Sequence, residues 1–263
     1  MLASYRRVFA HPGALAFSVT GLVARLPISM MTLGIVLLVS ALRDSYSLAG
    51  QVSAAYVIGN AASAVPQGRL VDRFGQRVVL HVDSVVFALS SSLAIVSITD
   101  GWTLPWPHVW AFMAGISLPQ IGTMVRARWA HLLEARTELN TAFAVESVAD
   151  ELVFVTGPAL VALLSTAWVP QAGLVTAVVV GTVGSVTLSL QLQTEPPAHP
   201  HDPEVVRSAM PWGLLVPLTI SAVALGSVFG ALEVATVAFA DGAGHKALSG
   251  LLLGAFALGS MLA

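Results

Sequence analysis

The chain has 263 residues and a formal net charge of −2; apolar residues make up 56% of it and charged residues only 10%. A soluble domain is usually about a quarter charged, so this composition excludes an ordinary water-facing globule. The absence of cysteine excludes disulfides and thiolate metal sites, and the seven scattered histidines show no metal-binding spacing. No basic stripe points to nucleic acid as a partner.

Apolar runs recur along the chain, each close to the ~20 residues that a helix needs to cross a bilayer. The first run follows Arg6 and Arg7 but is far too long for a signal peptide. The runs are continuous and do not alternate, which favours helices over a barrel. We predict eight helices, at about 14–42, 47–67, 78–98, 108–125, 140–166, 170–192, 213–240 and 246–263.

Basic residues predict the orientation, because positively charged loops stay in the cytoplasm. The N-terminus and every second loop carry Arg6, Arg7, Arg69, Arg73, Arg77, Arg126, Arg128, Arg136 and Arg207. The opposite loops carry only Arg43 and Lys246. We therefore expect a multi-pass protein of the bacterial inner membrane with a cytoplasmic N-terminus.

One linker divides the chain. Residues 193–212 are rich in proline and mixed charge, which suits a flexible cytoplasmic connection. The linker separates a six-helix bundle, residues 1–192, from the start of a second bundle, residues 213–263. A repeat at an offset of 200 residues supports the division, because 48–63 resembles 248–263, with identities at Leu48/Leu248, Gly50/Gly250, Ala55/Ala255 and Gly59/Gly259.

Between the second and third predicted helices the chain reads GRLVDRFGQR, residues 68–77. This resembles the signature G-x-L-a-D-r-x-G-r-k of the major facilitator superfamily, at the same place and on the cytoplasmic side. The resemblance implies a gating role, in which the aspartate helps to lock two bundles together, for Gly68, Asp72, Arg73, Gly75 and Arg77. Gln76 stands where the family has a basic residue, so one charge of the network is missing. The alternative is an ordinary positively charged loop.

The resemblance implies an all-α membrane fold of parallel six-helix repeats, with the first bundle complete and the second only begun. A twelve-helix member would need about four more helices than the eight predicted here. We therefore expect the chain to be truncated within its eighth helix. The missing C-terminal helices would be needed for a complete transporter, so we expect no transport by this chain alone.

Charges inside predicted helices are candidate functional groups, since an unpaired charge in a bilayer is costly. Arg25 lies near the middle of the first helix, and Glu146, Asp150 and Glu151 lie in the fifth. One hypothesis pairs Arg25 with Asp150 or Glu151 across a central cavity, where the acid that Arg25 does not hold binds the coupling proton. The other is a purely structural ion pair between the two helices.

Weaker candidates lie elsewhere. Glu233 in the seventh helix would line the cavity or face a hydrated outer vestibule. Gly157 and Pro158 resemble the Gly-Pro core of an antiporter motif in the fifth helix, although the glycines around that core are absent and a proline kink is often only structural. Arg126 and Arg128 are expected at the cytoplasmic end of the fourth helix, paired with Asp72 or anchored in headgroups.

The function predicted from these features is secondary transport by alternating access, in the form of proton-coupled export of a small organic solute or drug. No G-x-x-x-x-G-K-[ST] loop is present, so ATP is not expected as the direct energy source. As a transporter the protein is expected to need no cofactor and to have no enzymatic activity. The predicted partners are a small-molecule substrate, protons and the lipid bilayer. Uptake by the same fold, and a transporter-like ligand sensor, are the alternatives.

Overall fold

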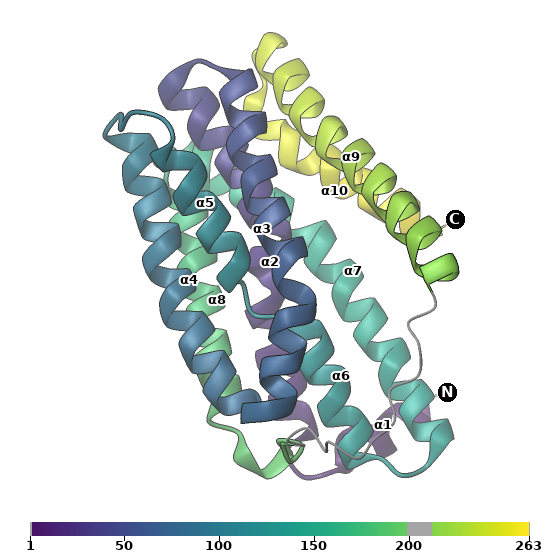
Figure 1. Cartoon of the computed structure of the whole chain (residues 1–263). Helices are drawn as coiled ribbons and strands as arrows, with labels where there is room; N and C mark the ends of the chain where they lie inside the picture. The colour runs from purple at the N-terminus through teal and green to yellow at the C-terminus, as the bar shows by residue number, and fades with distance from the viewer. Residues whose placement is uncertain (1, 199–211, 263) are drawn as a thin grey trace.

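The computed structural model describes residues 2–198 and 212–262, which form helices and the turns between them, without a strand (Figure 1). The helices are α1 (Leu2–Ala10), α2 (Ala14–Arg43), α3 (Tyr46–Phe74), α4 (Gln76–Thr99), α5 (Trp106–Ser117), α6 (Ile121–Leu132), α7 (Arg136–Ala167), α8 (Ala172–Ser189), η1 (Leu192–Thr194), α9 (Trp212–Gly242), η2 (Lys246–Leu248) and α10 (Ser249–Leu262). The predicted all-α fold is confirmed. Most of the predicted linker, 199–211, lies outside the described residues.

Five of the described segments are long and apolar enough to cross a membrane, namely α2, α4, α7, α8 and residues 219–242 of α9. The protein is therefore a multi-pass membrane protein. α3 is as long as these helices but more polar, and α5 and α6 have 12 residues each, too few to span ~30 Å of hydrocarbon alone.

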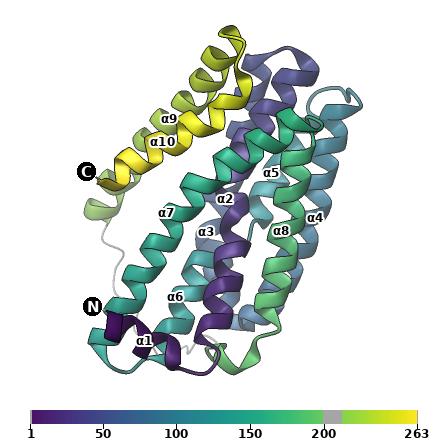
Figure 2. The same cartoon turned by 180° about the vertical axis from the view of Figure 1, so that it is seen from behind.

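α2 lies at the centre of the bundle, with α3, α7 and α8 packed around it (Figures 1 and 2). Its buried residues run almost without a break from Ser29 to Ser40. A helix that is apolar and buried all round is typical of a core position. Polar side chains on α2 therefore face protein and not lipid, which makes Arg25 a residue that needs partners within the bundle.

The single helix predicted at 108–125 is wrong, because α5 and α6 are separated at Leu118–Gln120. Pro119 has no N–H to donate and disfavours helical backbone at the residue before it. The buried amide of Gln67, from α3, bonds to the groups that the break exposes. Its nitrogen donates to the carbonyl oxygens of Ile116 (2.8 Å) and Leu118 (3.0 Å), and its oxygen accepts from the Gln120 N–H.

The predicted loop at 68–77 is also shorter than expected. α3 continues through Phe74 and α4 begins at Gln76, so Gly75 alone makes the reversal. Its φ of +83° lies in the left-handed region that favours glycine. Gly68 is helical, and a methyl group placed on it would meet nothing within 4 Å. Only one of the two signature glycines is therefore required by the local backbone.

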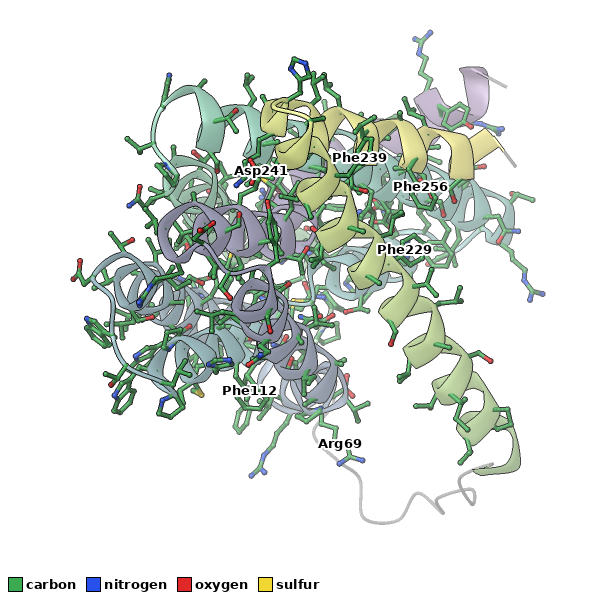
Figure 3. All side chains as sticks on the ribbon, turned by 90° about the horizontal axis from the view of Figure 1, so that it is seen from above. Arg69, Phe112, Phe229, Phe239, Asp241 and Phe256 are labelled. Carbon is green, nitrogen blue, oxygen red and sulfur yellow. The ribbon has the colours of Figure 1, made fainter. Side chains whose placement is uncertain are left out.

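α9 and α10 lie side by side and meet the bundle at the end opposite the N-terminus. They diverge from the bundle towards the end that holds the N-terminus (Figures 1 and 2). The rings of Phe229 and Phe256 join the two helices edge to face at 5.9 Å (Figure 3). α10 packs closely on α7, where Gly250 lies against the backbone of Pro158 and Gly254 lies near that of Val155. Small residues let helix backbones approach in this way.

Candidate functional site

The centre of the bundle holds a cluster of charged side chains around Arg25. This guanidinium is only 5% exposed and donates from Nη2 to Oε2 of Glu146, which is 2% exposed. Its Nη1 donates to Oδ1 of Asp150 at 3.2 Å. The two acids are four residues apart on α7 and so share one face of the helix. The predicted pairing of α2 with α7 through Asp150 is found, with Glu146 as an additional partner.

Two residues of α6 complete the cluster. Arg126 donates from Nη2 to Oδ2 of Asp150 at 2.6 Å, and the Trp129 indole N–H donates to Oε1 of Glu146 at 2.8 Å. Every carboxylate oxygen of the two acids therefore accepts a hydrogen bond. Two arginines face two carboxylates, so the cluster is balanced in formal charge, which offsets part of the cost of burying it in a bilayer.

The burial of the two acids differs. Glu146 is enclosed, and its partner Trp129 is fully buried, with the rings of Phe17 and Phe9 edge to face against it at 4.6 and 5.9 Å. Asp150 keeps about a third of its side-chain surface exposed, as does Arg126. Glu146 is therefore fixed by packing, whereas Asp150 and Arg126 reach an open space.

That space is a cavity of about 220 Å³ between α2, α6 and α7. Its polar lining comes from Arg25, Arg126, Asp150, Gln120 and Thr123, and the rest is mostly apolar. A larger depression of about 550 Å³ lies at the junction of α1 and α2, but it is shallow and no acid or arginine lines it. We take the smaller cavity as the candidate site because it contains the buried charges.

The other predicted acids lie apart from the cluster. Glu151 is half-buried and forms no ion pair with any residue of the described ranges. Glu233 is half-buried on α9 and accepts a hydrogen bond at 3.0 Å from the hydroxyl of Thr32 on α2. It is therefore placed against the first bundle, between α9 and α2.

The predicted gating residues occupy the end of α3 and the start of α4. Asp72 and Arg73 are exposed, and the Arg73 guanidinium lies 5.1 Å from the Phe74 ring centre. Within the described chain Asp72 has no ion-pair partner. The backbone N–H of Arg77 donates to Oε1 of Glu195 at 2.7 Å, so the first residues after α8 are held against this turn.

Gln76, the departure from the signature, is buried against Arg128. Its amide nitrogen donates to the carbonyl oxygen of Met124 at 3.0 Å, and its amide oxygen accepts from Nε of Arg128 at 2.8 Å. Arg128 is fully buried and also donates to Thr194 Oγ1 and to the carbonyl oxygens of Leu188 and Gln191. A basic residue at position 76 would meet this cation, which explains the glutamine.

The expectation for Arg126 and Arg128 is therefore wrong. Neither pairs with Asp72 in the described chain, because each has other partners. Residues two apart along a helix differ by about 200°, so the two side chains lie on opposite faces of α6. One face bonds to Asp150 and the other to Gln76. The spacing of two residues between the arginines indicates different partners if both lie on one helix. The predicted helix 108–125 ended before both of them.

Gly157 and Pro158 lie where α7 meets its neighbours. Gly157 is buried against Ser29 of α2, whose hydroxyl donates to the carbonyl oxygen of Val153 at 2.9 Å. Pro158 faces Gly250 of α10. The pair thus allows two helices to approach α7 closely, and its role as a kink of an antiporter motif stays a prediction.

Comparison with known protein families matches residues 14–263 to the Major Facilitator Superfamily. No curated protein and no solved structure matches the chain significantly. The match covers nearly the whole chain, including the short α3–α4 turn and the buried charges of α2, α6 and α7. The chain belongs to the Major Facilitator Superfamily, a family of secondary transporters of the membrane.

Proposed function

We propose that the protein exports a small organic solute by alternating access, coupled to proton entry, in a bacterial inner membrane with its N-terminus in the cytoplasm. The observation that carries the proposal is the buried cluster of Arg25, Glu146, Asp150 and Arg126 beside a cavity. Charged groups inside a membrane protein usually mark a substrate or ion pathway, because their burial is costly.

The distribution of exposed basic residues supports this orientation. Setting aside Arg126 and Arg128, whose partners lie inside the bundle, the end of the described structure that holds the N-terminus still carries Arg6, Arg7, Arg69, Arg73, Arg77 and Arg136. The other end carries Arg43 and Lys246. The bias keeps its sign without the two buried arginines, and it favours a cytoplasmic N-terminus.

The contact between α9 and the first bundle supports alternating access. At the end away from the N-terminus, the Tyr46 hydroxyl donates to Oδ2 of Asp241 at 2.6 Å, and Lys246 pairs with the same oxygen at 3.2 Å. Figure 3 shows Asp241 where α9 meets the bundle. Residues 223–231 of α9, towards the other end, are exposed. This arrangement fits a state closed outside and open to the cytoplasm.

Tyr46→Phe is expected to weaken that outer contact and to raise the population of the outward-open state. The chain has no cysteine, so Ile28→Cys in the cavity wall provides a single thiol to label. With Tyr46→Phe, labelling by a membrane-impermeant maleimide from the outside should rise, and labelling from the inside should fall. Tyr5→Phe in α1 is the matched control. Unchanged labelling from both sides would contradict an outer gate at Tyr46.

We assign the coupling proton to Glu233. Both carboxylate oxygens of Glu146 and of Asp150 already accept bonds from arginine or tryptophan. Glu233 accepts from the neutral hydroxyl of Thr32 and lies between α9 and α2. No ion pair joins Glu233 to another of the described residues. An unpaired carboxylate is costly at membrane depth, so binding of a proton would stabilise Glu233 more than either acid of the cluster.

The test uses proteoliposomes that contain the full product of the gene encoding this chain, with a pH-sensitive dye trapped inside. A panel of small organic acids, amines and neutral solutes is added, and solute counterflow and proton movement are followed together. We expect at least one solute to exchange and to move protons. Glu233→Gln should abolish proton movement but preserve counterflow, whereas Glu151→Gln should preserve both. Binding without exchange for every solute would contradict transport.

A further inference from the structure

The cavity beside the charge cluster has an unused donor. Arg25 bonds to both acids through its Nη atoms, but its Nε is buried and has no hydrogen-bond partner within the described chain. An arginine has five donors in a fixed plane, and leaving a buried charged donor unpaired is unfavourable. The free Nε belongs to a side chain that lines the cavity, so it points to an acceptor that is not part of the bundle.

Gly122 keeps this donor accessible. A methyl group placed on Gly122 would lie 3.3 Å from Nη1 of Arg126 and 3.8 Å from Nε of Arg25. Any larger side chain at this position would fill the space in front of both guanidinium groups. Gly122 itself lines the cavity. The absence of a side chain here leaves two cations facing one small volume.

Asp150 is the acid that a ligand can replace. It bridges the two arginines through its two oxygens and is one-third exposed to the cavity, whereas Glu146 is enclosed and held by Trp129. A ligand carboxylate has the same shape and charge as the Asp150 side chain. Arginine binds carboxylates in paired, charge-assisted hydrogen bonds, so the two groups would compete for Arg25 and Arg126.

We propose that the transported solute is a small organic anion whose carboxylate binds Arg25 and Arg126 in place of Asp150. The proposal names the substrate class of the proposed transporter and rests on that function. The cavity of about 220 Å³ has the liquid volume of roughly seven water molecules, at ~30 Å³ each, which suits an anion with a small apolar body. Ile28, Val153 and Phe154 supply the apolar walls.

The charge of such a substrate also fits export. A membrane potential of 100 mV, negative inside, favours outward movement of one negative charge by about fiftyfold in concentration ratio. Export of an anion in exchange for an entering proton therefore uses both the electrical and the chemical part of the proton gradient. Uptake of the same anion would move its charge against the potential, and one proton entering with it would only cancel that cost.

Benzoate is a suitable probe, with uncharged benzamide as its isostere. Binding of radiolabelled benzoate is measured by equilibrium dialysis on the purified gene product in phosphatidylcholine nanodiscs. Benzoate should bind and benzamide should not compete. Arg126→Gln should weaken benzoate binding by about tenfold, the value of one charge-assisted hydrogen bond. Arg136→Gln, which removes an exposed arginine outside the cavity, should leave it unchanged.

Two further variants separate a binding site from a structural ion network. Asp150→Asn removes the competing carboxylate and should strengthen benzoate binding by about tenfold, a gain that misfolding cannot produce. Gly122→Val keeps all charges but fills the cavity and should abolish binding. If Asp150→Asn binds benzoate no better than the unchanged protein, or Arg126→Gln binds it equally well, the cluster is structural and the proposal is wrong.

The remaining outcomes separate the two proposals and the two sources of anion. Benzoate binding without counterflow would contradict the transporter function but support the anion site. Counterflow of neutral or cationic solutes that benzoate does not inhibit would keep the transporter and overturn the substrate class. Repeating the dialysis with phosphatidylglycerol in the nanodiscs tests for an anionic lipid headgroup. Loss of benzoate binding there would assign the site to lipid and overturn the proposal for a solute.

Discussion

Gln76→Arg, which restores the basic residue of the family signature, is expected to destabilise this protein by roughly 3–5 kcal/mol. Gln76 is 1% exposed and its amide oxygen accepts from Arg128 Nε at 2.8 Å. A second guanidinium at this place would set two permanent cations together in a buried space. It would also lose the acceptor that Arg128 uses. Glu195, an acid near this turn, already accepts from the backbone N–H of Arg77.

The measurement is thermal unfolding in detergent micelles, followed by circular dichroism at one protein concentration. Arg77→Gln changes an exposed charge at the adjacent position and should shift the midpoint little. Gln76→Glu offers Arg128 a carboxylate and should be tolerated. Gln76→Arg combined with Arg128→Gln exchanges the two side chains and should recover part of the loss. A Gln76→Arg protein that melts like the unchanged one would refute the contact.

The family could be predicted from the sequence because its signature is local and lies between two helices that composition alone predicts. The partner of Gln76 could not be predicted in the same way. Arg128 lies 52 residues away along the chain, and the two residues meet because α5 packs against α4 and α6 then passes the first residue of α4. The sequence showed a missing charge, and the structure shows that the charge is supplied from another helix.

The charge cluster was predicted in part. The cost of a charge in a bilayer indicated that Arg25 needs an acid on α7, and this holds for Asp150. The hypothesis named Glu151 and not Glu146, but the face of the helix decides which side chains meet, and Glu146 and Asp150, four residues apart, are the pair that Arg25 contacts. The bond of Arg126 to Asp150 was not predicted, because Arg126 was placed beyond the end of the fourth helix. The structure has a separate helix after Pro119, α6, which extends seven residues beyond the expected end.

A close contact between two helix backbones lies where Gly59 of α3 meets α5. A methyl group on Gly59 would lie 3.1 Å from the backbone nitrogen of Ile116 and closer still to the carbonyl oxygen of Phe112. Gly115 on α5 lies equally tightly against the backbone of Tyr56. The two glycines let the helix backbones touch, and small residues are the main means of such contact in membranes.

Gly59→Ala is therefore expected to destabilise the bundle by about 2 kcal/mol or more, because backbone atoms cannot move aside as a flexible side chain can. Gly50→Ala, in the same helix, meets nothing within 4 Å and should be neutral or stabilising by up to ~1 kcal/mol, since alanine favours a helix over glycine. The two identical substitutions thus have opposite expected signs. Urea unfolding in micelles, followed by tryptophan fluorescence, measures both. Equal effects at the two positions would contradict the backbone contact between α3 and α5.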